Sequence, residues 1–305
     1  MSEPPTTRGH LTPGPHATIV RLPAPDDVAH LVRQLWIPEW DLPAGERAEQ
    51  LVLGYPASNV VVEPDGVALH GPTSRASVRV LTGRGWAVGA LLRPAGVLLF
   101  TERPAELLDG SVALPAPGLH SAVAEAMAGT DPLGLPARAA GPPEVVASAG
   151  GPTVRSAVGE TGDGTVAEAA PTGRQERAAA LLVDHVRALA AEVSPAAVRD
   201  GAMANRLVDL LEAEPGVRSP ADLARQLHVS ERSLQRLAAR FVGMPPQLLL
   251  RRRRLQEAAE RMRAEPAADL GTLAAELGFA DQSHLTREFR SVLGATPRGY
   301  GRGDG

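Results

Sequence analysis

Cysteine and lysine are both absent from this 305-residue chain, and aromatic residues are scarce. A chain without cysteine has no disulfide, no thiolate metal site and no cysteine nucleophile, which fits a reducing cytoplasm. Because aromatic residues make up 3% and apolar residues 44% of the sequence, the core must consist mainly of Leu, Val and Ala. No run of 18 apolar residues occurs, and the polar, Pro-rich start lacks a signal-peptide pattern, so we expect a cytoplasmic protein without a membrane span.

The charged residues are unevenly distributed along the chain. The formal net charge is −4, which alone argues against a nucleic-acid partner. Residues 218–305, however, contain 15 Arg and 10 acidic residues, a net charge of +5, whereas the preceding residues contain 16 Arg and 25 acidic residues, a net charge of −9. An acidic body joined to a basic C-terminal part predicts that only the C-terminal part meets phosphate groups.

Composition and periodicity divide the chain into segments. We expect a disordered tail over 1–16, a β-rich sensor or dimerisation domain over 17–128, a Gly- and Pro-rich linker over 129–173, a linking helix over 174–199 and a helical domain over 200–301. The predicted fold class is α+β multidomain, with a small antiparallel, cupin-like β domain ahead of an all-α domain. The amphipathic pattern of the linking helix leaves open whether it serves in dimerisation or in packing.

Within the β-rich segment, short apolar runs recur roughly every 8–12 residues and are separated by turn residues, which is typical of an antiparallel sandwich or barrel. A short helix over Leu119–Ala128 is expected to close this domain. The predicted strands lie around Leu51–Leu53, Val60–Val62, Val67–His70, Val78–Val80, Trp86–Leu92 and Val97–Phe100.

The basic C-terminal part contains an internal repeat. Residues 220–247 recur at 271–298, with an offset of 50 before a turn and of 51 after it. The pattern predicts two helix-turn-helix units, at 220–243 and 270–294, joined by one helix over Leu248–Ala264. Two crossing helices need a small side chain at their contact, and Ala224 and Ala274 provide it.

Turn and cap residues recur in both units. Gly278 occupies the turn of the second unit, where an unusual φ is needed, and His228 stands at that place in the first. Ser230 and Asp281 are the predicted N-caps of the second helices. The other matched pairs are Leu234 and Leu285, which bury the helix, Gly243 and Gly294, which end it, and Pro246 and Pro297, which prevent its continuation.

The second helix of each unit has an exposed face suited to DNA. Arg can bind guanine and Gln adenine through paired hydrogen bonds in the major groove, while Ser and Thr bind phosphates or bases. Two such helices can enter successive major grooves when they lie about 34 Å apart. The candidate DNA-binding residues are Arg232, Ser233, Gln235, Arg236 and Arg240 in the first unit and Gln282, Ser283, His284, Thr286, Arg287 and Arg290 in the second.

The segment Leu273–Arg290, with Gly294, Thr296-Pro297 and Tyr300 after it, closely resembles the second half of the DNA-binding domain of the AraC/XylS regulators. Ser230–Arg236 and Arg251–Ala259 resemble the first recognition helix and the linking helix of that family, so the resemblance spans about residues 200–301. It implies a transcription regulator that binds double-stranded DNA. The base contacts that it implies are at Arg232, Gln235, Arg236, Gln282, Ser283, His284 and Arg287.

Two further points follow from this resemblance. Residues 22–115 more weakly resemble an uncharacterised β-rich sensor domain found ahead of such regulators, and no ligand is implied. The family often has an aromatic residue where Ala238 lies, as Phe289 does in the second unit. We therefore expect looser packing of the first unit, partly offset by Phe241, and less stringent DNA reading by it.

Other candidate sites have weaker support. His70, Glu63 and His120 are the only plausible metal ligands of the β domain, and no His-x-His pair occurs, so neither a metal nor a cofactor is expected. No Gly-rich phosphate loop, Ser-His-Asp arrangement or paired carboxylate motif stands out, so no enzyme is expected. Two alternatives stay open, a cupin-like enzyme tethered to DNA and an architectural DNA binder without an effector.

The tryptophans and an arginine run also allow two interpretations. Trp36, Trp40 and Trp86 are expected to fill the core rather than to line a ligand pocket. The side chains of Arg251–Arg254 point in different directions on a helix, so about two of them are expected to reach phosphate and the others to pair with acids such as Glu257. A small-molecule effector and a second copy of the chain are further partners that the sequence leaves open.

Overall fold

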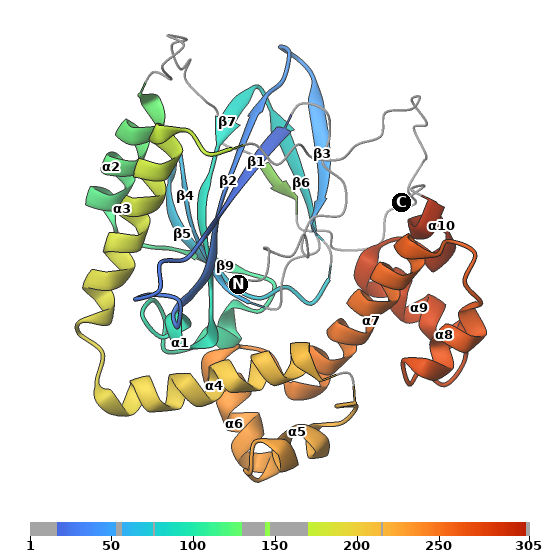
Figure 1. The fold of residues 1–305 in the computed structure, drawn as a ribbon. Helices are drawn as coiled ribbons and strands as arrows, with labels where there is room; N and C mark the ends of the chain where they lie inside the picture. The colour runs from blue at the N-terminus through green and yellow to red at the C-terminus, as the bar shows by residue number, and fades with distance from the viewer. Residues whose placement is uncertain are drawn as a thin grey trace.

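The computed structural model describes residues 17–52, 57–75, 77–129, 144–146, 170–214 and 216–302. Figure 1 shows a β domain, two helices beside it and two further groups of helices. The predicted tail over 1–16 lies outside the described residues, as does most of the predicted linker over 129–173. An antiparallel β domain ahead of a helical region confirms the predicted fold class.

The β domain contains two antiparallel sheets within the described residues. Its strands are β1 (Ala17–Pro23), β2 (Val32–Asp41), β3 (Arg47–Val52), β4 (Asn59–Glu63), β5 (Gly66–His70), β6 (Ser77–Thr82), β7 (Arg84–Trp86), β8 (Val88–Leu92), β9 (Ser111–Ala113) and β10 (Glu144–Val146). The larger sheet has the order β1-β2-β8-β4-β5-β9, with β7 also paired to β2, and the smaller has the order β10-β6-β3. Val62 pairs with Val67, so the predicted strands at these residues, β4 and β5, form an antiparallel hairpin.

One predicted strand is wrong. Val97–Phe100 does not extend the sheet, because α1 (Pro94–Val97) occupies the start of this run and a turn follows it. Pro94 is the first helical residue, where its fixed φ favours a helix, and Val97 is buried. A short apolar run does not by itself distinguish a buried strand from a buried helical turn. A short 3-10 helix, η1 (Pro104–Leu107), follows α1.

Two helices cover the larger sheet and complete its core. They are α2 (Pro117–Ala128) and α3 (Gly173–Ala190), which lie side by side in Figure 1. Val123 of α2 and Leu182 and Val186 of α3 are fully buried in the same cluster as the sheet side chains. The apolar face of α3 is therefore buried within the chain, which favours the packing role over dimerisation for this helix.

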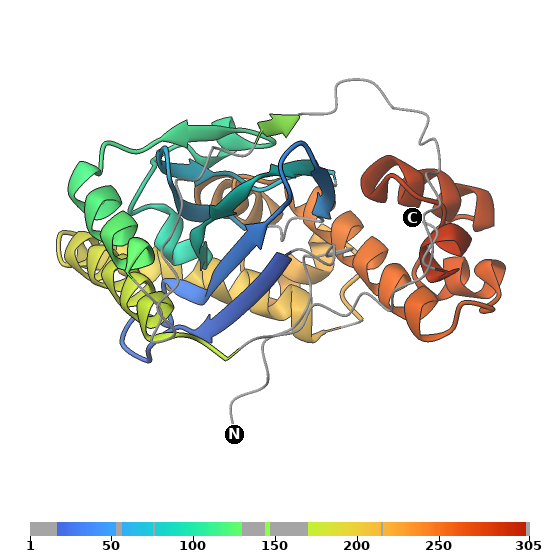
Figure 2. The ribbon, with the colours of Figure 1, turned by 90° about the horizontal axis from the view of Figure 1, so that it is seen from above.

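The C-terminal region contains only helices in its described part. They are α4 (Pro195–Ala213), α5 (Pro220–Gln226), α6 (Glu231–Phe241), α7 (Pro246–Ala264), α8 (Leu270–Glu276), α9 (Gln282–Leu293) and α10 (Pro297–Arg302). None of the described helices is both long enough and apolar enough to cross a membrane. Seen from above, α8, α9 and α10 lie beyond the far end of α7, away from the β domain (Figure 2).

Helix α7 contributes to two separate cores. Leu249 and Leu250, near its start, are buried with residues of α4, α5 and α6. Leu255 and Met262, further along, are buried with residues of α8, α9 and α10. The two helix-turn-helix units thus have cores of their own, and α7 is the element that they share.

Candidate nucleic-acid interface

The turns of the two units adopt the predicted backbone conformation. Gly278 has a φ of +74°, and His228, at the matching place, has a φ of +56°. This left-handed region costs glycine little, whereas it is uncommon for other residues and less so for His, Asn and Asp. Ala224 and Ala274, at the helix crossings, are buried as predicted.

Both candidate recognition helices begin at the predicted cap. In α6 the backbone N–H of Ser233 donates to Oγ of Ser230 at 3.1 Å, and in α9 the N–H of His284 donates to a carboxylate oxygen of Asp281 at 2.7 Å. Each cap satisfies a backbone donor that has no partner within its helix. The first turns of α6 and α9 are therefore fixed, and the residues just after the caps have defined positions.

The same helices end in the same way. Gly243 follows α6 and Gly294 follows α9, with φ values of +76° and +75°. Pro246 and Pro297 do more than prevent continuation, because they are the first residues of α7 and α10. Both units therefore repeat one local structure from the turn to the start of the next helix.

Most of the predicted DNA-binding residues are exposed on α6 and α9. The exposed ones are Arg232, Gln235, Arg236 and Arg240 of α6 and Gln282, Ser283, Arg287 and Arg290 of α9. The buried face of each helix is apolar, with Leu234 and Leu285 completely inaccessible to solvent. Each unit therefore presents an exposed polar face on a helix whose opposite face is held by its core.

Four of the candidate residues have structural contacts or partial burial. The Arg240 guanidinium forms an ion pair with Asp200 of α4 at 3.0 Å. Ser233, which is half-buried, accepts a hydrogen bond from the Ser230 hydroxyl at 2.9 Å. Nδ1 of His284 accepts a hydrogen bond from a backbone N–H at 3.2 Å, which places a ring proton on Nε2. Thr286 is half-buried.

The arginine run on α7 has partners within the chain. Arg251 pairs with Glu288 of α9, and Arg254 donates to the carbonyl of Gly278 at 3.1 Å. Arg253 donates to the carbonyl of Val217 at 3.2 Å and lies 4.0 Å from Glu257, the predicted type of acidic partner. The fourth, Arg252, is 1% exposed. Three of the four arginines therefore have partners within the chain and the fourth is buried, and the expectation that about two of them reach phosphate stays a prediction.

The first unit has Ala238 where the second has the aromatic Phe289, and its own aromatic side chain, Phe241, follows one helical turn later. Ala238 is completely buried, and Phe241 of the same helix is 1% exposed. In α9 the aromatic and the smaller side chain are exchanged, since Phe289 and Val292 occupy the matching positions and are both buried. Each of the helices α6 and α9 therefore buries one phenylalanine, but that of α6 lies nearer the end of its helix.

The tryptophans of the β domain serve its packing. Nε1 of Trp40 donates to the Thr82 carbonyl at 3.2 Å, and its ring packs with Leu81 of the smaller sheet. Nε1 of Trp36 donates to Asn59 at 3.1 Å. Trp86 packs against the main core, so these rings do not surround a pocket.

Two of the three candidate metal ligands of the β domain have partners within the chain, and the third, His70, is buried. Glu63 pairs with Arg79, while Nε2 of His120 lies 3.1 Å from the Pro64 carbonyl. Burial, with a smaller contribution from Arg79, lowers the pKa of His70 to about 4. Burial also raises the pKa of Glu63, against the attraction of Arg79. In the described part of the chain, no three His, Asp or Glu side chains are grouped as a metal ion would require.

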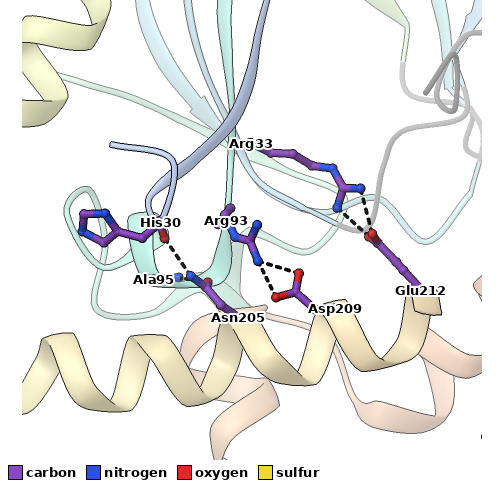
Figure 3. A network of polar contacts seen from close by, with 7 residues as sticks. All are labelled: His30, Arg33, Arg93, Ala95, Asn205, Asp209 and Glu212. Carbon is purple, nitrogen blue, oxygen red and sulfur yellow. Dashed lines mark hydrogen bonds and ion pairs between the residues drawn. The ribbon is translucent and has the colours of Figure 1, made fainter. Parts of the chain in front are cut away.

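Sequence reasoning missed the polar contacts between the β domain and α4. Figure 3 shows three side chains of α4 that point to the β domain: Asn205, Asp209 and Glu212. Glu212 pairs with Arg33, which lies 179 positions earlier, and Asp209 pairs with Arg93. Local patterns cannot pair residues so far apart, and the only sequence signal was the spacing of polar residues along one face of α4.

A small hollow lies beside these contacts. It is lined by residues of both regions, including Arg93, Val97, Val208 and Phe241, and holds about 10 Å³ of free space. This volume is about the room of a single water molecule. The hollow is too small for an organic effector as it stands.

Comparisons with known proteins agree with this architecture. Residues 223–303 match the model of a helix-turn-helix domain, and residues 20–113 match that of a domain of unknown function. No curated protein matches the chain. The first match falls on the two helix-turn-helix units and the second on the β domain.

Solved structures of ToxT from Vibrio cholerae show a weak overall likeness. A ligand-free variant from strain SCE256 has 11% identity and a TM-score of 0.40, over 87% of this chain and 96% of that one. The form from the same strain with a bound unsaturated fatty acid has 11% identity and a TM-score of 0.36, over 98% and 96%. These values are too low to support inferences about function. The domain match and the capped, repeated units identify residues 223–303 as an AraC-type helix-turn-helix domain in a two-part transcription regulator.

Proposed function

We propose that the protein is a sequence-specific regulator that reads two successive major-groove segments, one with α6 and one with α9. The observation that carries this proposal is the structural repeat: each unit positions an exposed polar helix face by a capped N-terminus and a buried core. A recognition helix needs this combination, because it must place a few side chains against base edges without moving.

The length of α7 supports the use of both helices at once. Its 19 residues span about 28 Å, at 1.5 Å per residue. One turn of DNA is about 34 Å, so a helix of this length suits two units on one face of the duplex. Arg251 and Arg254 tie α7 to the second unit, which fixes the orientation of that unit.

The residues expected to read bases are the exposed ones near the helix starts. Arg236 of the first unit and Arg287 of the second suit guanine, and Gln235 and Gln282 suit adenine. The N-terminal domain serves as a modulating domain, because it packs on α4 and α6 of the first unit. As a DNA-binding regulator, the protein would act in the cytoplasm, and no residue is assigned a catalytic, cofactor or metal role.

The test is a pair of matched substitutions on DNA that the wild-type protein selects from a random pool. Arg236→Ala and Arg287→Ala should each weaken binding by about 1–3 kcal/mol and relax the preference at different base positions. Arg177→Ala, an exposed arginine on α3, serves as the control and should change nothing. Equal losses on all sequences would mean that these arginines touch only phosphate, and the proposed base contacts would be wrong.

A further inference from the structure

We propose that the N-terminal domain holds only the first helix-turn-helix unit, through one face of α4 and the end of α6, and thereby sets how α6 meets DNA. The proposal rests on the proposed function and adds a regulatory interface to it. The second unit is connected to the N-terminal domain mainly through α7, so a change in the N-terminal domain should affect the reading of one DNA segment and spare the other.

The contact residues of α4 lie on one stripe of the helix. Gly201, Asn205, Asp209 and Glu212 follow one another at spacings of three or four residues, which places them on one face. The neighbouring face of α4 belongs to the core of the first unit, where Leu207 is completely buried. Helix α4 therefore lies between the N-terminal domain and the first unit and contacts both.

Two ion pairs of the interface have a well-defined geometry. Arg33 donates to both carboxylate oxygens of Glu212 at 2.7 Å, and Arg93 also approaches both oxygens of Asp209 (Figure 3). Paired hydrogen bonds of this kind fix orientation as well as distance. The Arg33–Glu212 pair is about three-quarters buried at each side chain, so solvent screens it less than a surface pair.

Asn205 is the most deeply buried polar residue of this face, with 8% of its surface exposed. Its side-chain amide donates to the His30 carbonyl at 2.7 Å, and its oxygen accepts from the backbone N–H of Ala95 at 3.0 Å. Both partners are backbone groups of the N-terminal domain (Figure 3). A buried amide with both ends paired in this way defines one register of α4 against that domain.

Two glycines show how close the backbones lie. A Cβ atom on Gly201 would lie 2.8 Å from the Cβ of Ala95 in α1. A Cβ atom on Gly243, after α6, would lie 2.5 Å from the carbonyl oxygen of Pro104 in η1. Gly294, at the matching place after α9, has no atom within 4 Å of such a Cβ. The end of the first recognition helix is therefore packed against the N-terminal domain, and the end of the second is open.

The buried phenylalanine of α6 also lies at this interface. Phe241 lines the hollow together with Arg93, Pro94 and Val97 of the N-terminal domain. Arg240, the residue before it, is held by Asp200 of α4. The last turn of α6 is therefore contacted by the N-terminal domain at Phe241 and by α4 at Arg240.

The contacts position α6 without covering its DNA-facing residues. Arg232, Gln235 and Arg236 remain exposed, although Phe241 in the last turn of the same helix is buried. A displacement of α4 would therefore move the recognition residues rather than uncover them. The second unit is held differently, because α8, α9 and α10 pack mainly with one another and with α7 within the described residues.

The test exchanges the charges of the Arg33–Glu212 pair. R33E and E212R each place like charges together, whereas the double variant R33E/E212R restores an opposite-charge pair. The matched control exchanges Arg251 and Glu288, which tie α7 to α9 in the second unit and have similar exposure. The six variants and the wild type are measured on the selected DNA and on duplexes in which the first or the second segment is scrambled.

Each single variant of the Arg33–Glu212 pair should lose about fivefold or more in affinity for the selected DNA. Scrambling the first segment should then cost these variants less than it costs the wild type, while scrambling the second should cost the same. The double variant should recover to within about twofold of the wild type. The Arg251–Glu288 exchange should give the reverse pattern, with the effect on the second segment.

Equal effects on both segments, no effect, or no recovery in the double variant would overturn the inference while leaving the proposed function intact. A wild-type protein that selects no sequence would instead contradict the proposed function. Amide hydrogen exchange of the free proteins then decides the inference without DNA. R33E and E212R should speed exchange in α4 and α6 and leave α8, α9 and α10 unchanged, and uniform exchange rates would contradict the inference.

Discussion

The matched glycines after the two recognition helices allow a quantitative test of the domain contact. Gly243 and Gly294 have nearly the same φ, +76° and +75°, and each N–H donates to a carbonyl of its own helix, at 2.9 and 3.0 Å. Replacing either with Ala forces a side chain into the left-handed region, which costs about 1–2 kcal/mol. This part of the cost should be the same in both units.

The surroundings of the two positions differ. Around Gly294 there is open space, so the backbone cost is the whole cost. At Gly243 the new Cβ would lie 2.5 Å from the oxygen and 2.7 Å from the carbon of the Pro104 carbonyl. These are backbone atoms, so no change of rotamer relieves the overlap, and overpacking adds about 1–3 kcal/mol. Gly243→Ala should therefore destabilise the first unit by about 2–5 kcal/mol in total.

The assay is native-state hydrogen exchange of both variants and the wild type, read separately for α6 and α9. This choice avoids a single unfolding free energy, which is poorly defined for a chain of several cores. The opening free energy of α6 in Gly243→Ala should fall by more than that of α9 in Gly294→Ala. Falls that agree to within about 0.5 kcal/mol, the usual effect of an unstrained surface substitution, would refute the packing of α6 against η1.

Three further predictions concern single side chains. Gly201→Ala should destabilise the interface, because the new Cβ would meet that of Ala95. Ala normally stabilises a helix by about 1 kcal/mol relative to Gly, so a rise in thermal stability would contradict this contact. Asp281→Ala should cost the second unit about 1 kcal/mol through the lost N-cap, whereas Asp281→Asn should cost less, as read by exchange in α9. Burial lowers the pKa of His70 from 6.5 to about 4 in the folded protein. As the pH falls, the unfolded chain therefore takes up the proton first. About 3 kcal/mol of folding stability present above pH 6.5 should be lost between pH 6.5 and 4. Native-state hydrogen exchange of β5, compared between wild type and His70→Gln over this pH range, isolates this contribution from that of Glu63, whose raised pKa acts in the opposite sense. Parallel pH profiles of the two proteins would contradict it.

Local chemistry explains which features the sequence predicted. The caps at Ser230 and Asp281 and the left-handed turns at His228 and Gly278 depend on residues within a few positions of one another, and the repeat showed each of them twice. The strand expected at Val97–Phe100 is absent because Pro94 favours the start of a helix and the short apolar run is buried in a helical turn. Its β-like composition did not distinguish these two cases.

Contacts between distant segments could not be predicted in the same way. Asn205 bonds to Ala95 across 110 positions, and no periodicity connects the two. The arginines at 251–254 were expected partly at phosphate because composition shows charge without its partners, and the structure pairs Arg251 with Glu288 of another helix. Composition likewise gave no sign that Arg240, which stays a predicted DNA-binding residue, pairs with Asp200 of α4.

The most direct test of the central claim is selection of bound sequences from a random DNA pool by the full-length protein. We expect one enriched site with two segments about one helical turn apart, 10–10.5 base pairs from centre to centre, and an affinity that falls steeply with salt as counterions are released. Arg236→Ala should relax the preference at base positions of one segment and Arg287→Ala at positions of the other. Enrichment of a single segment that both variants erase equally, or no enrichment at all, would contradict the reading of DNA by both helices.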